Sequence, residues 1–130
     1  MRLQYGLSAL LALSLLAGCA SREADMKATG GKPMTGAELL QRNSKEVKIA
    51  WNTPQGYAGV DTYRPDGTAS VDYGKGTDTG VWRVVDDTLC TTWKTLRNGA
   101  EKCFVVYKVG DGKYKSFNSD GSLASDSHEI

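Results

Sequence analysis

The side chains that could carry chemistry are few and scattered in this chain of 130 residues. Trp82, Trp93 and Tyr107 could line a barrel mouth or cleft for an apolar or sugar-like ligand, although large aromatic residues more often fill a core. Asp86-Asp87 could supply half of a calcium site or a catalytic carboxylate pair. An Asp between two strands more often bonds its own backbone, so we expect a turn there.

Other patterns that resemble catalytic or cofactor motifs do not meet the geometry that such sites need. His128 is the one histidine of the chain, which argues against His-rich metal sites and against most nucleophile–histidine pairs. Asp126, Ser127 and His128 are the parts of a triad, but neighbours in a frayed tail cannot converge on a substrate. The Gly-rich stretch 73–80 lacks the spacing of a phosphate-binding motif and is expected to be a loop. We therefore expect no catalytic residues, no metal site and no cofactor.

The first nineteen residues have the organisation of an export signal. Arg2 precedes an apolar run over 7–17, which is too short to span a membrane as a helix. The run ends in Leu16-Ala17-Gly18-Cys19, which resembles the lipobox of bacterial lipoprotein precursors. In that class the signal peptide is cut before the cysteine, whose thiol and new amine are acylated. The resemblance implies a signal peptide over 1–18 and lipidation at Cys19, and an ordinary signal peptide with a chance cysteine is the alternative.

The residues after the cysteine bear on the destination of the protein. Ala20 and Ser21 follow, without an Asp, and by resemblance to enteric lipoproteins this implies an outer-membrane lipoprotein with its domain facing the periplasm. In a host with one membrane, the outer face of that membrane is expected. Without residues 1–18 the chain has 15 basic and 15 acidic residues, since that segment contains only Arg2 among the charged residues. Net charge therefore gives no attraction to nucleic acid, and we expect membrane attachment through the acyl chains.

The other two cysteines form a natural pair once Cys19 is assigned to lipid. Cys90 and Cys103 would lie in an oxidising compartment, with no Cys-x-x-Cys and no histidine near them, which favours a structural disulfide over a metal or redox site. A two-residue turn at Asn98-Gly99 in unbroken register would not place these two cysteines opposite each other. We therefore predict a wider loop over 94–101, or a bulge there.

The chain beyond the signal is expected to form a tether and one domain. Residues 19–33 have no apolar period and are typical of a flexible, lipidated tether. Residues 34–130 are too few for two cores and are expected to form a single β-rich domain. Thr35 and Glu38 have the spacing of a capping box, which predicts a short helix ending near Asn43.

Strands and turns dominate the rest of the sequence. We expect Leu39 and Leu40 of the short helix to face a sheet. Alternating apolar residues between turn motifs predict seven or eight strands, near 47–51, 57–63, 68–73, 80–85, 88–93, 102–109, 113–117 and 122–127. The short connections leave no room for crossover helices. The expected fold is therefore mainly β, an antiparallel meander that is barrel-like or strongly curved and is closed by the helix.

Several of these motifs also occur together in a known family. Gly80-Val81-Trp82, Leu89-Cys90-Thr91-Thr92-Trp93, Cys103 and Gly110-Asp111-Gly112-Lys113-Tyr114 resemble the pattern of small exported bacterial proteins of uncharacterised function. The resemblance covers residues 34–121. It implies an all-β domain with one disulfide, and it brings no activity or site residues with it.

Three functional hypotheses follow. The first is a non-enzymatic, membrane-anchored binding or accessory module of the envelope, whose partner is an envelope protein, a glycan or an apolar ligand. The second is an inhibitor of lysozyme-type cell-wall hydrolases, although no inhibitor motif is present. The third is a hydrolase that uses Asp61 and Asp72 as paired carboxylates.

Overall fold

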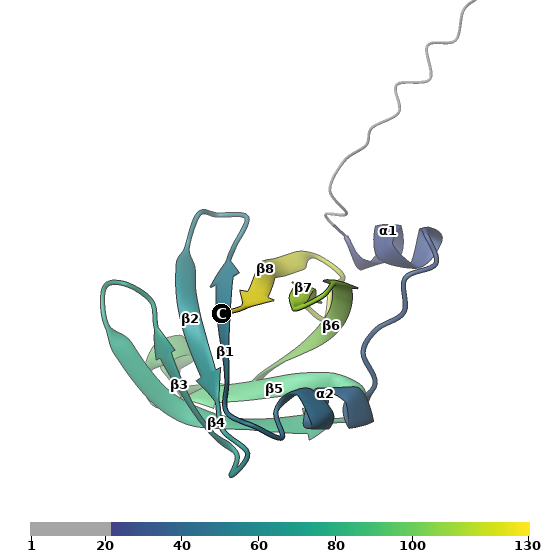
Figure 1. The fold of residues 1–130 in the computed structure, drawn as a ribbon. Helices are drawn as coiled ribbons and strands as arrows, with labels where there is room; N and C mark the ends of the chain where they lie inside the picture. Colours follow the sequence, from purple (N-terminus) through teal and green to yellow (C-terminus); the bar gives the residue numbers. More distant parts are fainter. Residues whose placement is uncertain (1–21) are drawn as a thin grey trace, which may run out of the picture.

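Eight antiparallel strands close into a barrel in the computed structural model, which describes residues 22–130 (Figure 1). Each strand pairs with the next, and β8 returns to pair with β1. The closed barrel confirms the predicted antiparallel meander and leaves no unpaired edge strand. The strands are β1 (Val47–Asn52), β2 (Ala58–Tyr63), β3 (Thr68–Asp72), β4 (Thr77–Val85), β5 (Thr88–Trp93), β6 (Lys102–Gly110), β7 (Lys113–Phe117) and β8 (Leu123–Glu129).

Two segments that were expected to be irregular belong to strands. β4 begins at Thr77, so the loop expected over 73–80 is confined to 73–76. Asp126, Ser127 and His128 lie in β8, where they pair with both β1 and β7, so the frayed tail was a wrong prediction. Consecutive side chains of a strand point to opposite faces, which still keeps these three from converging.

The connections between antiparallel strands alternate between the two ends of the barrel. Residues 53–57, 73–76, 94–101 and 118–122 connect the strands at one end, which we call the open end. Residues 64–67, 86–87 and 111–112 lie at the opposite, closed end. Helix α2 (Gly36–Arg42), which leads into β1, contacts β4 and β5. The backbone N–H of Gly36 donates to Asp87 Oδ1 at 2.8 Å, which fixes the helix at the closed end.

Helix α2 has the predicted capping box. The Glu38 backbone N–H donates to Thr35 Oγ1 at 3.2 Å, and the Thr35 N–H donates to Glu38 Oε1 at 3.1 Å. Leu39 is fully buried in the hydrophobic core, as expected. Leu40 is 53% exposed, so the expectation that it faces the sheet was wrong. A helix of two turns presents one narrow face to the barrel, and successive side chains are about 100° apart.

The disulfide joins directly opposite residues of β5 and β6, as predicted. Cys90 pairs with Cys103 in the strand register, and their Sγ atoms are bonded. The connection between these strands contains the short 3-10 helix η1 (Leu96–Gly99), which confirms the wider loop over 94–101. Arg97 and Asn98 have φ values of 57° and 53°, a left-handed conformation that lets the chain reverse within this loop.

Residues 22–33 form an ordered segment in place of the irregular tether. They contain helix α1 (Glu23–Ala28), which is too short to be stable alone. The Glu23 N–H donates to Gly121 O at 2.8 Å, and the Met34 N–H donates to Val106 O at 2.7 Å. These bonds anchor both ends of the segment to the barrel, so tertiary contacts supply the stability that the local sequence lacks. No helix within residues 22–130 is long and apolar enough to cross a bilayer.

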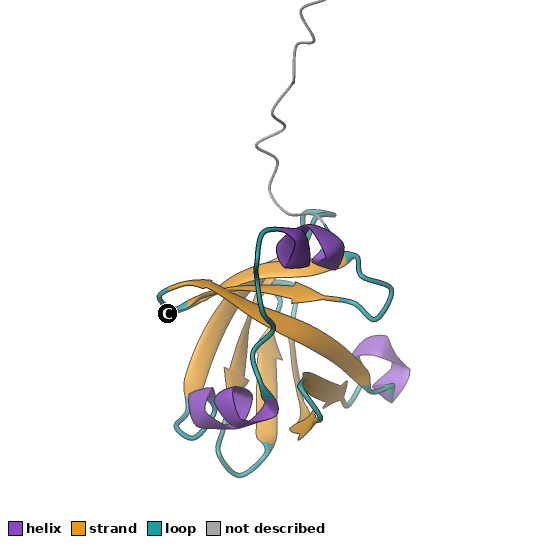
Figure 2. Cartoon of the chain, turned by 90° about the vertical axis from the view of Figure 1, so that its right-hand side faces the viewer, coloured by secondary structure: helices purple, strands orange, loops and turns teal. Residues whose placement is uncertain are grey.

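Helices α1 and α2 lie at opposite ends of the molecule (Figure 2). Arg22 forms an isolated β-bridge with Ser122, in the connection between β7 and β8. The chain therefore joins the barrel at its open end. The lipobox and the expected lipid site Cys19 lie outside the described residues.

Candidate ligand-binding site in the barrel

The interior of the barrel contains a cavity of about 410 Å³. Its volume is within the range of small-molecule sites, and eight strands enclose just enough space for one small ligand. Residues of the open-end connections reach its wall, so the cavity extends to that end. They are Thr53, Gln55, Leu96, Arg97 and Asn118. Its apolar wall comes from inward-facing side chains of the strands, including Ile49, Val71, Leu89, Phe104, Val106 and Leu123.

A partly buried carboxylate lies on this wall. Asp61 Oδ1 accepts a hydrogen bond from Trp51 Nε1 at 2.9 Å, and Oδ2 accepts one from the Tyr63 hydroxyl at 2.8 Å. Burial raises the pKa of Asp61, while these two hydrogen bonds and the charges of Arg97 and Arg42 oppose the rise. Burial, together with the Asp61 charge, also holds the pKa of Tyr63 well above its ordinary value. The carboxylate is thus held by neutral donors on two neighbouring strands.

A partly buried guanidinium faces the same cavity. Arg97 belongs to η1 at the open end, and its Nη2 donates to Thr91 Oγ1 of β5 at 2.6 Å. Nη1 is buried and has no hydrogen-bond partner within residues 22–130. Burial lowers the pKa of Arg97, and the Asp61 charge opposes that shift. The side chain therefore carries a positive charge and an unused donor into the cavity wall.

The loop that presents Arg97 is held by a single acidic side chain. Asp78 Oδ2 accepts hydrogen bonds from Leu96 N, Thr95 N and Thr95 Oγ1, each at 2.9 Å. Its Oδ1 accepts a fourth from Thr79 N at 2.9 Å. These donors, the Leu96 N–H first among them, lower the pKa of Asp78 to about 2. The charged carboxylate thus fixes the conformation of η1.

A second arginine lines the cavity from the closed end. Arg42, the last residue of α2, places its guanidinium carbon 4.8 Å from the ring centre of Tyr114 and 5.7 Å from that of Tyr63. Its Nε donates to Asn43 Oδ1 at 3.1 Å. This cation–π arrangement holds Arg42 over the bottom of the barrel.

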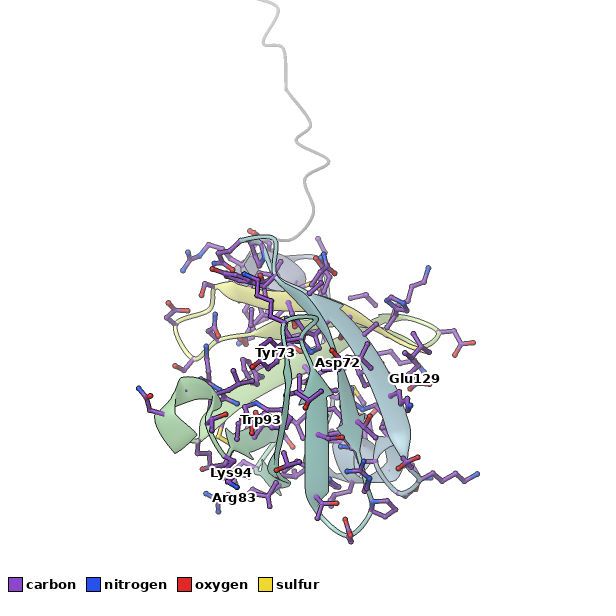
Figure 3. All side chains as sticks on the ribbon, turned by 90° about the vertical axis from the view of Figure 1, so that its left-hand side faces the viewer. Asp72, Tyr73, Arg83, Trp93, Lys94 and Glu129 are labelled. Carbon is purple, nitrogen blue, oxygen red and sulfur yellow. A yellow bond between two sulfur atoms is a disulfide. The ribbon has the colours of Figure 1, made fainter. Side chains whose placement is uncertain are left out.

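The three aromatic residues proposed as ligand contacts lie in three different surroundings. Trp93 lines the cavity, at the end of β5 next to the outer residue Lys94 (Figure 3). Trp82 is not among the lining residues, because it packs edge-to-face on Tyr63 in the core and donates through Nε1 to Arg64 O at 2.7 Å.

Tyr107 lies away from the cavity as well. It is fully buried, packs edge-to-face on Phe117, and donates through its hydroxyl to Glu23 Oε1 of α1 at 3.3 Å. Among the described residues, the ion pair of Glu23 is with Lys27, one turn later in α1. The phenol therefore connects the barrel wall to the N-terminal helix.

The paired carboxylates of the hydrolase hypothesis do not meet. Asp61 is opposite Val71 in the register of β2 and β3, and both line the cavity. Asp72, the next residue, is exposed and accepts a hydrogen bond from Gly74 N. The two carboxylates therefore project from opposite faces of the barrel wall.

The turn expected at Asp86-Asp87 is present, and the hydrogen bond of Asp87 is to the start of helix α2 instead of its own backbone. Asp86 adopts a φ of 51°, and Asp87 accepts from the start of α2. In the part of the chain that the structure describes, Cys90, Glu101 and Cys103 are grouped closely enough to hold a metal, but the two sulfur atoms are bonded to each other.

Sequence reasoning named Asp61 only as one of two paired carboxylates and missed the other charged residues of the cavity. Trp51 and Asp61 occupy inward positions of β1 and β2, which strand alternation could have indicated. Arg97 and Arg42 lie outside the strands, so no periodic pattern marks them. Comparison of the chain with protein-family models, with curated proteins and with solved structures finds no match.

Proposed function

We propose that this protein is a lipid-anchored, non-enzymatic binding module of the bacterial envelope whose barrel takes up a small ligand. The observation that carries this proposal is the cavity of about 410 Å³, in which a mostly apolar wall surrounds the partly buried polar side chains Asp61 and Arg97. Sites for small molecules combine such walls with a few fixed polar groups. Ligand exchange takes place through the open end.

The N-terminal segment supports an orientation of the open end toward the membrane. Arg22 joins the barrel at Ser122, and the expected lipid site Cys19 precedes Arg22 by three residues. Three residues span at most about 11 Å when extended. Lipidation at Cys19 would therefore keep the mouth of the cavity close to the bilayer, from which an apolar ligand can enter.

The distribution of charge between the two ends supports the same orientation. The closed-end connections carry one basic residue and four acidic residues, which an anionic membrane surface repels: Arg64, Asp66, Asp86, Asp87 and Asp111. The open-end connections carry three basic and two acidic residues: Lys75, Lys94, Arg97, Glu101 and Asp120.

The anchor is tested in the producing bacterium. Mass spectrometry of the mature protein should find diacylglyceryl and acyl groups on Cys19, and Cys19→Ser should move the protein from the membrane to the soluble fraction. Unmodified Cys19 in membrane-derived protein would refute the anchored part of the proposal. The binding part is tested separately.

The binding test compares two substitutions of similar size inside and outside the barrel. Residues 20–130 contain all eight strands, both α-helices and the disulfide, so this chain is used without its lipid. Ser116→Phe places a ring into the cavity wall, whereas Val109→Phe adds one on an exposed part of β6. Titration with envelope lipid extract, followed by tryptophan fluorescence, should give saturable binding that Ser116→Phe abolishes and Val109→Phe preserves. Binding that is unaffected by Ser116→Phe would contradict a site inside the barrel, and catalytic turnover of a bound compound would contradict a non-enzymatic role.

A further inference from the structure

The cavity wall contains a partly buried cationic group whose hydrogen-bonding capacity is not fully used. Arg97 donates through Nη2 to Thr91, while Nη1 is buried without a partner among the described residues. The salt bridges formed within residues 22–130 do not include Arg97. Removing part of a charged group from water without giving it an ionic partner is unfavourable. An anionic group in the cavity would therefore gain a charge-assisted hydrogen bond from Nη1.

Asp61 is not the anionic partner of Arg97. Both of its oxygens accept hydrogen bonds from neutral donors, Trp51 and Tyr63, and it makes no salt bridge with Arg97. The cavity lining has one acidic side chain, Asp61, against three basic ones: Arg42, Arg97 and Lys102. The charge of the lining is positive when Asp61 is ionised, and more positive when it is protonated. Either state favours an anion over a cation.

The size and the wall of the cavity restrict what can accompany that anion. A cavity of about 150 Å³ accommodates benzene, so 410 Å³ has room for roughly 15 non-hydrogen atoms. This is enough for a single medium-length chain and too little for a phospholipid with two long chains. Most of the lining area is apolar, which suits an alkyl chain, while Thr53, Gln55 and Asn118 add neutral polar side chains at the open end.

We propose that the barrel binds a single-chain amphiphile with one acidic head group, either a medium-chain carboxylate or an alkyl phosphate. The acidic head pairs with Arg97 Nη1, and the alkyl chain packs on the apolar wall formed by Ile49, Val71, Leu89, Phe104 and Val106. This inference rests on the proposed function of the barrel as a binding module, and it adds the chemical class of the ligand.

Four probes with the same alkyl chain and different head groups test the proposal. Chain 20–130 is titrated by calorimetry with dodecanoate, dodecyl phosphate, dodecanol and dodecylamine, each below its micelle concentration. At least one of the two anions should bind ten to a hundred times more tightly than the alcohol, as expected for a hydrogen bond to a charged group. The anion that binds more tightly shows whether the site prefers a carboxylate or a phosphate head group.

Variants of one loop test the part played by Arg97. Arg97→Gln should weaken binding of the preferred anion at least tenfold and remove its advantage over dodecanol. Lys94→Gln removes a positive charge from the same connection, outside the cavity, and should leave affinity unchanged. Arg97→Lys keeps the charge and should retain part of the preference. Circular dichroism and thermal unfolding establish that each variant is folded.

A second readout reports on the head group itself. In dodecanoate labelled with ¹³C at the carboxyl carbon, the pKa of the bound carboxyl group should be lower than that of the free acid. Arg97→Gln should reduce this difference in pKa. Equal affinity for acid and alcohol, tightest binding of dodecylamine, or wild-type affinity in Arg97→Gln would overturn the inference. If none of the probes binds while envelope lipid extract still binds in a way that Ser116→Phe abolishes, this inference fails and the proposed function stands.

Discussion

Breaking the disulfide should cost a large part of the stability of the barrel. Cys90 and Cys103 are 13 residues apart, and the bond between them closes a loop that contains η1. For a loop near this length, the loss of chain entropy in the unfolded state corresponds to about 3 kcal/mol. Domains of this size have a free energy of unfolding of roughly 5–15 kcal/mol. At about 4–8 °C per kcal/mol, the melting temperature should fall by roughly 12–24 °C.

The assay compares three forms of chain 20–130 by urea unfolding, followed by tryptophan fluorescence and circular dichroism. These forms are the oxidised protein, the protein reduced with a phosphine, and the double variant Cys90→Ala/Cys103→Ala. The reduced protein isolates the effect of the bond, because Cys90 is fully buried and its replacement by Ala also removes packing. The m value should rise on reduction, since an unfolded chain without the cross-link exposes more surface.

A loss below 1 kcal/mol on reduction, with an unchanged m value, would refute this reasoning. It would mean that the hydrogen bonds between β5 and β6 and the contacts of the 94–101 loop already restrict the unfolded chain. A loss well above 5 kcal/mol would also contradict the entropic account, because the folded barrel itself would then depend on the bond.

Three further predictions concern the core, the loop that carries Arg97 and the N-terminal helix. Leu39→Ala should lower the free energy of unfolding by about 2–5 kcal/mol, whereas Leu40→Ala, at an exposed position, should change it by less than about 0.5 kcal/mol. If urea unfolding gave similar losses for the two variants, the assignment of the buried face of α2 would be contradicted. The pKa of Asp78 is lowered to about 2 in the folded protein, below the value near 3.9 in the unfolded chain. The ionised carboxylate therefore stabilises the fold above pH of about 4, and this stabilisation is lost as the pH falls toward 2. Asp78→Asn should therefore flatten the dependence of the urea midpoint on pH in this window, and an unchanged slope would count against it. Tyr107→Phe removes the hydrogen bond to Glu23 and should speed hydrogen exchange of the α1 amides several-fold, while exchange in the barrel stays slow. Unchanged exchange of the α1 amides would show that the backbone hydrogen bonds alone hold the helix.

Local patterns located most of the secondary structure. The strands Thr88–Trp93 and Lys113–Phe117 have the predicted bounds, because alternating burial and flanking turns act over a few residues. The Thr35–Glu38 capping box is equally local. Helix α1 and the start of β4 were missed because both depend on contacts with distant parts of the chain. Gly121 receives the first N–H of α1, and β3 and β5 flank β4.

The candidate site was much harder to predict than the fold. The sequence offers Trp93, Trp82 and Tyr107 alike as possible ligand contacts, and composition does not distinguish the three. Their surroundings differ because Trp93 faces the cavity, Trp82 packs against Tyr63, and Tyr107 donates a hydrogen bond to α1. Inward and outward positions alternate along a strand, but the depth of an inward side chain depends on what faces it across the barrel.

The amino-acid sequence by itself determined the order of the strands, the antiparallel connections, the capped helix and the pairing of the two cysteines, since each depends on spacing along the chain. Only the tertiary structure decided that the sheet closes, that Arg97 reaches inward from a loop to Thr91, and that Asp61 lies in the same cavity. The physical reason is that closure brings β8 against β1 and gathers four separate connections at one end. The cost of burying a charge there depends on neighbours that are distant in sequence.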